Sequence, residues 1–246
     1  MSSQEDKIEQ YLKVRRGLIT QKLDPMSCAL IIIDMQEYQV SEDSSVVCLF
    51  DKIVPGLLQY FLARVQDKVI PNIIHLLEFF RAHDLPVYFT KFASMRPDRK
   101  DYGRNIRAVN EIAENLIKEP IFPDKQDPSA SIIPELSPQG NEVIILKGTS
   151  GTFSSTDLDH QLRNLGVSMV IFTGVVTNFC VENTARIAAD LGYNVILIDD
   201  ACAAWSQSLH DATLRNIQLM YGSVLTTEEI LKKFNKSIKN SVITVK

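Results

Sequence analysis

The most constraining feature of this sequence is a continuous apolar run, Cys28-Ala29-Leu30-Ile31-Ile32-Ile33, that stops at Asp34. Apolar and polar residues do not alternate in it, which is typical of a strand covered on both faces. Segments with helical periodicity separate it from later apolar runs, so we expect parallel strands joined by right-handed crossovers. The further strands are predicted at 86–90, 143–146, 169–173, 195–198 and, as a short one, 223–225.

The predicted fold class is therefore α/β, a three-layer α/β/α Rossmann-like fold with a mainly parallel sheet of about six strands. We expect one domain over residues 1–246, with an N-terminal helical arm (1–24) and a polar, frayed tail (237–246). Residues 92–140 are polar and contain several prolines, so they are the least regular part. Helices are predicted at 4–22, 57–82 (with a second helix starting at Pro71), 105–117, 156–165, 178–191, 208–221, and from Thr226 or Thr227 onward.

Composition narrows the function classes. The 26 Lys and Arg against 30 Asp and Glu leave a net charge of −4, which gives no long-range attraction to nucleic acids or anionic membranes. No apolar stretch approaches the roughly 20 residues that span a bilayer, and the polar, acidic N-terminus differs from a secretory signal. The even number of cysteines, with no C-x-x-C pair, is compatible with two disulfides, but for a large chain without a secretory signal we expect reduced thiols and a cytoplasmic protein. The cysteines are Cys28, Cys48, Cys180 and Cys202.

Three reactive residues follow predicted strands: Asp34, Lys147 and Cys180. Taken singly, an Asp there is more often a turn former, a Lys a solvated charge and a Cys an inert packed thiol. However, ligands of an open parallel sheet bind outside the carboxyl ends of its strands. The convergence of all three residues on that edge predicts a reactive site.

The chemistry of this trio is coherent. An ammonium and a helix N-terminus lower the pKa of a thiol, so we expect Lys147 to favour the thiolate of Cys180. Asp34 can take the thiol proton and return it to a leaving nitrogen. Backbone N–H groups in the turn 176–180 can hold an oxyanion. Together these parts describe acyl transfer through a thioester.

The motifs around these residues resemble the isochorismatase-like cysteine hydrolase superfamily over about 28–225. That resemblance implies a catalytic triad of Asp34, Lys147 and Cys180. It also implies a non-proline cis peptide at Val176–Thr177, an oxyanion hole formed by the N–H groups of Thr177 and Cys180, and a homo-oligomer. The motifs are Ala29-Leu30-Ile31-Ile32-Ile33-Asp34-Met35-Gln36, Lys147 with Gly151-Thr152-Phe153, and Gly174-Val175-Val176-Thr177-Asn178-Phe179-Cys180-Val181.

Within that superfamily, the chain departs from the nicotinamidase pattern. Nicotinamidases carry an Asp-x-His metal site where this chain has Thr90-Lys91-Phe92-Ala93-Ser94, and none of its 4 histidines has an Asp-x-His context. We therefore expect no catalytic metal and no cofactor. The segment 177–186, with Thr177-Asn178-x-Cys180-Val181-Glu182-x-Thr184-x-Arg186, resembles instead the ureidoacrylate and biuret amidohydrolase branch.

Several other residues are candidates for the site, each with a plainer alternative. Gln36 contacts the substrate or stabilises a turn, and His210 is a base for Cys180 or a packed residue. Trp205 lies at the pocket rim or in the core. The aromatic candidates line the pocket or simply pack. The predicted substrate contacts are Gln36, Tyr38, Phe153, Asn178 and Phe179.

The predicted function is that of a cysteine amidohydrolase. It cleaves a C–N bond of a small amide, ureido or carbamoyl compound through a thioester acyl-enzyme and releases ammonia or an amine. Two alternatives stay open: an isochorismatase-type vinyl-ether hydrolase, and a non-catalytic binding or scaffold protein of the same fold. The Gly148–Thr152 loop could hold a phosphate, but no nucleotide-binding fingerprint accompanies it. The expected partners are a small-molecule substrate and further copies of this chain, with no nucleic acid and no membrane.

Overall fold

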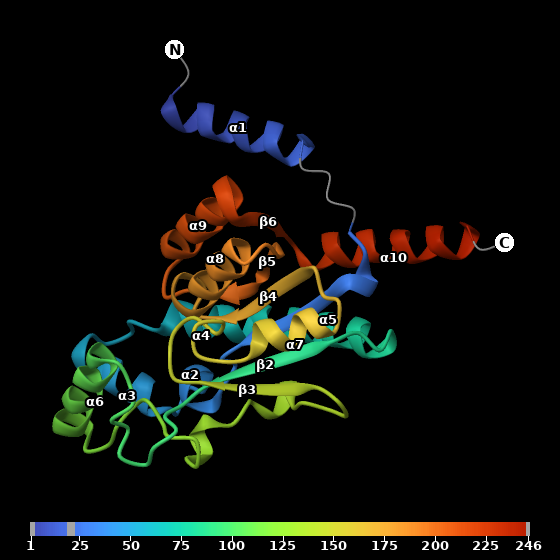
Figure 1. Ribbon diagram of the computed structural model, residues 1–246. Coiled ribbons are helices and arrows are strands. Elements are labelled where there is room, and N and C mark those ends of the chain that lie inside the picture. The colour runs from blue at the N-terminus through green and yellow to red at the C-terminus, as the bar shows by residue number, and fades with distance from the viewer. Residues whose placement is uncertain (1–2, 19–22, 245–246) are drawn as a thin grey trace.

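The computed structural model describes residues 3–18 and 23–244 and contains a six-stranded, all-parallel sheet (Figure 1). The strand order is β3-β2-β1-β4-β5-β6, so the chain reverses its direction of winding between β1 and β4. The predicted fold class is confirmed. The strands are β1 (Cys28–Ile33), β2 (Val87–Phe92), β3 (Val143–Lys147), β4 (Met169–Val175), β5 (Asn194–Ala203) and β6 (Gly222–Leu225).

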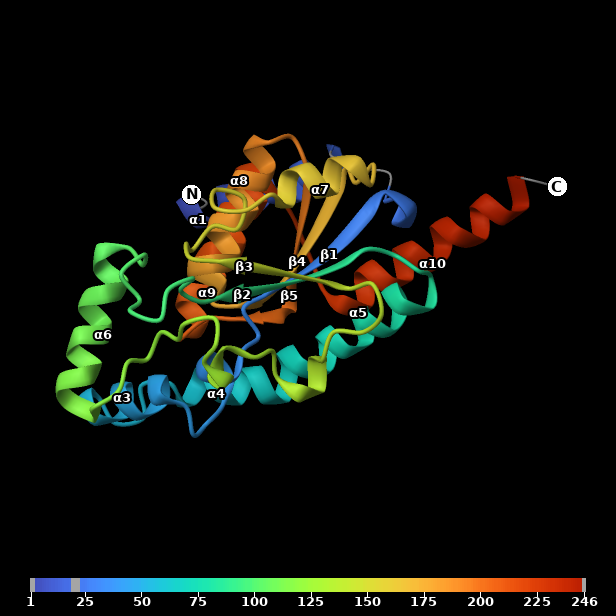
Figure 2. The same ribbon diagram turned by 60° about the horizontal axis from the view of Figure 1, so that its bottom comes forward.

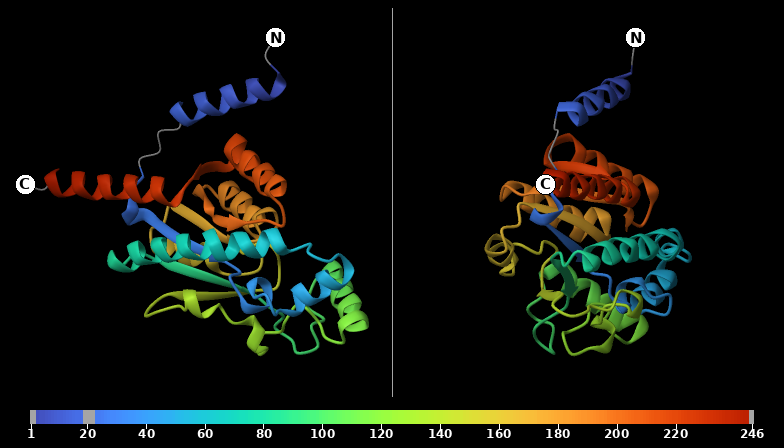
Figure 3. Two further views of the ribbon diagram at one scale, coloured as in Figure 1. Left: turned by 180° about the vertical axis from the view of Figure 1, so that it is seen from behind. Right: turned by 90° about the vertical axis from the view of Figure 1, so that its right-hand side faces the viewer.

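Helices cover both faces of this sheet. The helices α4 (Gln59–Arg64), α5 (Ile70–Ala82) and α10 (Thr227–Thr244) cover one face, and α7 (Leu158–Asn164) and α8 (Glu182–Asp190) cover the other (Figures 1 and 3). The remaining helices are α1 (Gln4–Leu18), α2 (Glu37–Val40), α3 (Ser45–Ile53), α6 (Arg104–Ile117) and α9 (Gln207–Asn216). Short 3₁₀ turns occur at Pro25–Ser27, Pro128–Ala130 and Pro134–Leu136, and π-helical turns at Val65–Val69, Thr177–Val181 and Ile217–Tyr221.

The position of β1 in the middle of the sheet accounts for its apolar sequence. Leu30 and Ile32 of β1 pack into the core on the α5 side, while Ile31 and Ile33 pack into the core on the α8 side. Every residue of β1 is fully buried. Because both faces are covered, the strand is apolar throughout and ends at the first residue that carries a charge, Asp34.

Of two helical predictions, one agrees to within a residue and one was wrong in detail. A helix does start at Pro71, since α5 begins at Ile70 with Pro71 in its first turn, and a π-helical turn at Val65–Val69 joins it to α4. The predicted frayed tail is instead the end of α10, which continues to Thr244. Although α10 is rich in charged residues, one of its faces is apolar and includes the buried Ile230 and Phe234. Residues 245–246 lie outside the described residues.

The N-terminal arm lies against the edge of the sheet. Helix α1 packs beside β6, apart from the two helical layers (Figure 3). The Arg15 guanidinium donates to the carbonyl oxygens of Gln218, at 2.5 Å, and Gly222, at 3.1 Å. Of the helix predicted at 4–22, the structure describes α1 up to Leu18, and 19–22 lie outside the described residues. Within the described part of the chain, no helix is long and apolar enough to cross a bilayer.

Candidate active site

The carboxyl ends of β1, β3 and β4 bring the three predicted reactive residues together. Asp34 follows β1, Lys147 is the last residue of β3, and Cys180 lies in the π-helical turn after β4. The Lys147 Nζ is 2.7 Å from Asp34 Oδ2, and both side chains are almost completely buried. Cys180 is near enough to both for the charges of Asp34 and Lys147 to shift the pKa of its thiol. We call these three residues the catalytic edge.

A close approach of two strands fixes the position of Asp34. Gly174 of β4 has φ +98°, and a Cβ at this position would lie 2.1 Å from the carbonyl oxygen of Ile33. Only glycine therefore allows β1 and β4 to pack this closely. Asp34 itself has φ 48°, in the left-handed region that Asp tolerates better than most residues. The chain thus turns away from the sheet immediately after the strand, with the carboxylate left at its end.

Thr90 of β2 orients the Asp34 carboxylate, which the sequence analysis did not anticipate. The Thr90 hydroxyl donates to Asp34 Oδ1 at 2.6 Å and accepts the Asp34 backbone N–H at 3.1 Å. Asp34 Oδ2 is buried and accepts no hydrogen bond of ordinary geometry from the described residues, although the Lys147 Nζ lies beside it. This oxygen is therefore available to accept a proton from a neighbouring group.

The Lys147 ammonium is enclosed by acceptors. It donates to the carbonyl oxygens of Thr149, at 3.1 Å, and Ser150, at 3.3 Å, and lies 4.9 Å from the centre of the Phe92 ring. Burial by itself lowers the pKa of Lys147, but the charges of Asp34 and Cys180 and their hydrogen bonds outweigh it, so that its pKa is raised. Lys147 thus stays a cation at neutral pH, unlike the solvated surface charge considered above.

The pKa of Cys180 differs from the expectation. Burial raises it to about 12, and the adjacent Asp34 carboxylate raises it as well, while Lys147 lowers it. Lys147 lowers this pKa, as predicted, but desolvation of the sulfur and the Asp34 carboxylate outweigh it, so the net shift is upward instead of downward. The protonated thiol is therefore favoured at neutral pH, and formation of a thiolate calls for a base near the sulfur.

The turn that carries Cys180 also contains the amides predicted to form the oxyanion hole. The cis peptide bond joins Val175 to Val176, one residue before the predicted Val176–Thr177 bond, because β4 runs to Val175 before the turn begins. Among the described residues, no acceptor outside this turn receives the N–H of Thr177 or Cys180. The first amides of a helix commonly lack a partner within the helix, which suits them to hold an oxyanion.

His210 supports this turn instead of acting on the thiol. It is fully buried, and its Nδ1 lies 2.9 Å from the Thr177 hydroxyl. Its Nε2 lies 2.9 Å from Asp199 Oδ1 and 2.9 Å from an Arg64 Nη2. Because both ring nitrogens are occupied, His210 is a packed residue that holds Thr177 in place, the second of the two roles considered for it.

A cavity of about 860 Å³ opens above Cys180. Of the predicted contacts, Tyr38, Asn178 and Phe179 line it, and Trp205 lies in its wall against Phe179, with ring centres 5.8 Å apart. The cavity extends to α3 and α6, which lie side by side beyond the end of the sheet (Figure 2). We call its aromatic lining the aromatic wall, which comprises Tyr38, Phe50, Phe61, Phe92, Phe122, Phe179 and Trp205.

Two predicted contacts do not line this cavity. The Gln36 amide is buried and cross-links backbone, since it accepts the Phe92 N–H at 2.7 Å and donates to the Ala130 carbonyl at 2.8 Å. Phe153 packs in the core on the α8 side, 5.8 Å from the Tyr193 ring. Gln36 thus has the structural role considered as its alternative, and Phe153 is a packed core residue.

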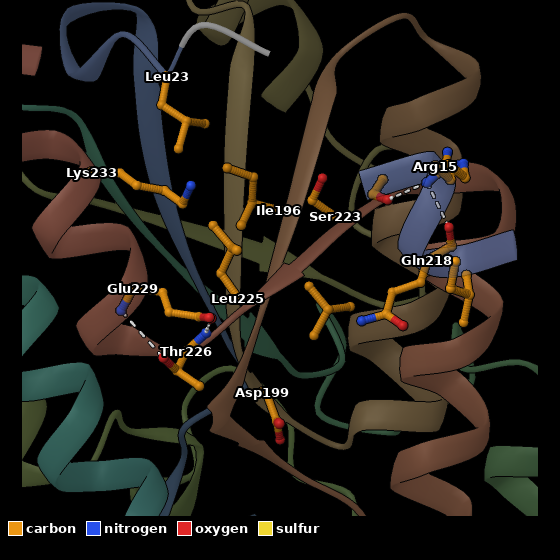
Figure 4. A pocket seen from close by; sticks show the side chains of 13 residues that line it. Arg15, Leu23, Ile196, Asp199, Gln218, Ser223, Leu225, Thr226, Glu229 and Lys233 are labelled. Atoms are coloured by element: carbon orange, nitrogen blue, oxygen red, sulfur yellow. Dashed lines mark hydrogen bonds between the residues drawn. The ribbon is translucent and has the colours of Figure 1, made fainter. Parts of the chain in front are cut away.

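A second cavity, of about 390 Å³, lies between the arm and α10 at the β6 edge (Figure 4). Several of its polar groups already form hydrogen bonds within the protein. Arg15 caps the turn before β6, while Thr226 and Glu229 exchange reciprocal hydrogen bonds of 2.8 and 3.2 Å that cap the predicted start of α10. No cysteine, serine nucleophile with a base, or metal cluster accompanies it, and the described residues contain no group of three His, Cys, Asp or Glu that could hold a metal.

Comparison with known proteins agrees with this geometry. The family model described as isochorismatase domain matches residues 28–229, the segment from β1 into α10. The chain belongs to the isochorismatase family. It is accordingly an isochorismatase-family hydrolase, and the superfamily resemblance inferred from its motifs is confirmed.

Individual relatives show which members of the family this chain is similar to. The isochorismatase family protein YwoC of Bacillus subtilis is 30% identical over 87% of this chain and 97% of that protein. The ureidoacrylate amidohydrolase RutB of Acinetobacter baylyi is 36% identical over 42% of each chain. The crystal structure of a cysteine hydrolase from Pseudomonas syringae has a TM-score of 0.74, with 25% identity over 88% of this chain and 96% of that one. This isochorismatase-family chain is thus similar to the ureidoacrylate amidohydrolase branch.

Proposed function

We propose that this protein is a cysteine amidohydrolase that cleaves a C–N bond of an amide, ureido or carbamoyl compound through a thioester. The observation that carries the proposal is the buried Asp34 carboxylate, which pairs with Lys147 and lies near enough to Cys180 to affect its thiol. A thiol whose pKa is raised to about 12 by desolvation needs a base beside it, and Asp34 is suited to that role. The similarity to ureidoacrylate amidohydrolases supports ureido compounds among the substrates.

The first half of the proposed reaction forms the acyl-enzyme. Asp34 Oδ2 takes the thiol proton while the Cys180 sulfur attacks the substrate carbonyl carbon, and the carbonyl oxygen becomes an oxyanion held by the N–H groups of Thr177 and Cys180. When the tetrahedral intermediate collapses, the C–N bond breaks. Asp34 returns its proton to the leaving nitrogen, and ammonia or an amine departs.

The second half hydrolyses the thioester. Asp34, again a carboxylate, takes a proton from water as the water oxygen attacks the same carbonyl carbon. The C–S bond then breaks, the proton goes back to the sulfur, and the carboxylic or carbamic acid leaves. Throughout, the Lys147 ammonium stabilises the carboxylate and the developing thiolate, since its Nζ lies 2.7 Å from the carboxylate and its charge lowers the pKa of the Cys180 thiol.

Ammonia release from a panel of small amides, ureas and carbamoyl compounds tests this function. We expect release from at least one class, with kcat reduced by about 10² to 10⁴ in Asp34→Asn, the range that general acid–base catalysis contributes. Asp34→Asn keeps the size of the side chain, so a folded but inactive variant identifies the missing base. Full activity in Asp34→Asn, or no ammonia from any compound, would refute the proposal.

We further propose a cytoplasmic, homo-oligomeric enzyme that needs neither metal nor cofactor. The four cysteines are all free thiols, which supports a reducing compartment. The arm supports assembly, since Tyr11 and Val14 are 51% and 54% exposed on α1. Large exposed apolar side chains of this kind mark interaction surfaces when they gather on one element.

A further inference from the structure

The cavity above Cys180 is larger and more apolar than a short polar ureido acid requires. Its volume of about 860 Å³ is within the range of pockets that enclose drug-sized ligands. The lining combines the rings of the aromatic wall with aliphatic side chains such as Val46, Ile106 and Val109. A ligand that fills this space must therefore bring an apolar, preferably aromatic, body.

The charged lining of the cavity is of positive sign only. None of the described residues that line it is an aspartate or glutamate, and Arg104 is the only lining side chain there that carries a charge at neutral pH. Arg104 has no ion-pair partner among the described residues, whereas Arg96 pairs with Asp98 and Arg99 with Asp124 in the segment before it. An arginine that lines an apolar cavity without a carboxylate partner is suited to bind one from a ligand.

The backbone reinforces this positive end. Arg104 is the first residue of α6, a helix of 14 residues whose N-cap, Gly103, offers no side-chain cap. Gly103 and Asn105 also line the cavity, so the N-terminal end of the helix borders the same space as the guanidinium. The positive end of a helix favours a negative charge nearby.

A polar side chain also lies near Cys180 in the same cavity. Asn178, in the turn of Cys180, lines the cavity, and its Oδ1 is buried with no hydrogen-bond partner among the described residues. Because this oxygen is closed off from the open space, a substrate N–H next to the reacting carbonyl can donate to it only after the Asn178 side chain turns toward the ligand. The cavity thus combines a thiol with a polar amide nearby, an apolar lining and a cation on α6.

We infer that the substrate is an amide or ureide with an aromatic or extended apolar body and a carboxylate remote from the scissile bond, and that Arg104 binds this carboxylate. The inference rests on the proposed function and deepens it. The scissile carbonyl lies at Cys180, the apolar body packs against the aromatic wall, and the carboxylate reaches the α6 end. Substrates of this class differ from short ureido acids in both length and apolar content.

Binding to Cys180→Ala enzyme tests the inference without turnover. Trp205 is the only tryptophan of the chain and lines the cavity, so its fluorescence reports occupancy. The probes are 4-(3-amino-3-oxopropyl)benzoate, its neutral analogue 3-(4-methylphenyl)propanamide, and the short N-carbamoylglycine. We expect the benzoate to bind about tenfold more tightly than the methyl analogue, the scale of one charge-assisted contact.

Arg104→Met and Arg107→Met provide the matched pair. Both residues are exposed on α6, but only Arg104 lines the cavity. In the Cys180→Ala background, Arg104→Met should weaken benzoate binding about tenfold and leave the methyl analogue unchanged, while Arg107→Met changes neither. Equal binding of the two aromatic probes, or equal losses in both arginine variants, would overturn the inference.

Turnover by the enzyme with Cys180 intact separates the two proposals. Ammonia release from N-carbamoylglycine with a higher kcat/KM than from the benzoate amide would overturn the substrate class and leave the amidohydrolase function standing. Ammonia release from none of the wider panel would refute the proposed function, and the binding data would still decide the inference about Arg104. A higher kcat/KM for the benzoate amide, reduced through KM in Arg104→Met, supports both.

Discussion

The catalytic edge and the aromatic wall of the same cavity are built in different ways. Strand ends and buried polar contacts hold the catalytic edge, from the Asp34–Lys147 ion pair to the Thr90 hydroxyl. Side chains from β2, the π-helical turn Thr177–Val181 and several helices and loops form the aromatic wall, which includes exposed residues such as Phe179. The side chains of the catalytic edge are held at strand ends, whereas most side chains of the aromatic wall come from helices and loops. We therefore expect the reaction rate and the substrate selectivity to be separable. Variants of the edge should change kcat, and variants of the wall should change KM.

The largest effect is expected at the nucleophile. Cys180→Ala should lower kcat/KM at least about a thousandfold, because the covalent intermediate cannot form. Steady-state ammonia release with the best substrate of the panel measures it. The matched control is Cys202→Ala, since Cys202 is a buried free thiol on β5 that is not part of the catalytic edge. Comparable activity in both cysteine variants would contradict the thioester mechanism.

Removing the ammonium should have the next largest effect. Lys147→Met retains most of the side-chain length but not the charge, and kcat should fall about a hundredfold, the scale for loss of one buried electrostatic contact. Lys147 lowers the pKa of Cys180, so its loss raises that pKa further above about 12. Alkylation of Cys180 by iodoacetamide, which needs the thiolate, should therefore shift to higher pH in the variant.

Lys147→Arg controls for a simple loss of folding. It keeps the charge but presents a broader, planar group, so it should restore part of the activity and part of the alkylation profile. Circular dichroism confirms that each variant is folded. Superimposable pH profiles of alkylation in wild type and Lys147→Met, with unchanged turnover, would remove Lys147 from the mechanism.

A smaller effect should follow loss of the hydroxyl that orients the base. Thr90→Val removes the hydrogen bond to Asp34 Oδ1 with little change in shape, and we expect kcat to fall about tenfold with KM unchanged, equivalent to about 1.4 kcal/mol, the scale of one hydrogen bond to a charged group. Thr173→Val on β4 is the matched control, since the buried Thr173 hydroxyl has no partner among the described residues. A kcat that falls equally in both variants would show that Thr90 does not position the base.

The smallest effect on turnover is expected from assembly and from metal removal. Sedimentation at micromolar concentration should show a dimer or larger oligomer of the 27.7 kDa chain, and Tyr11→Ser with Val14→Ser should weaken it because both side chains are exposed on α1. Exhaustive chelation should leave kcat unchanged. A monomer in wild type would refute the assembly, and a stoichiometric metal whose removal abolishes turnover would refute the metal-free mechanism.

Sequence alone predicted the catalytic edge better than the aromatic wall, for a physical reason. The apolar run of β1 defines a buried strand, and parallel strands necessarily bring Asp34 and Lys147 to one edge. By contrast, α3 and the arrangement of 92–140 depend on long-range contacts that leave no periodic signal. The roles of Thr90 and Gln36 depend on which backbone groups lie beside them, and the pKa of Cys180 depends on its burial, neither of which a linear pattern specifies.

The covalent intermediate on Cys180 is the central claim, and trapping it is the most direct test. Wild-type enzyme mixed with its best amide substrate and quenched in acid within one turnover should gain the mass of the acyl group, and peptide mapping should place the gain on Cys180. The same quench of Cys180→Ala should show no gain. Turnover by wild type with no acyl mass on Cys180 under any quench time, or an adduct on a different residue, would contradict the account.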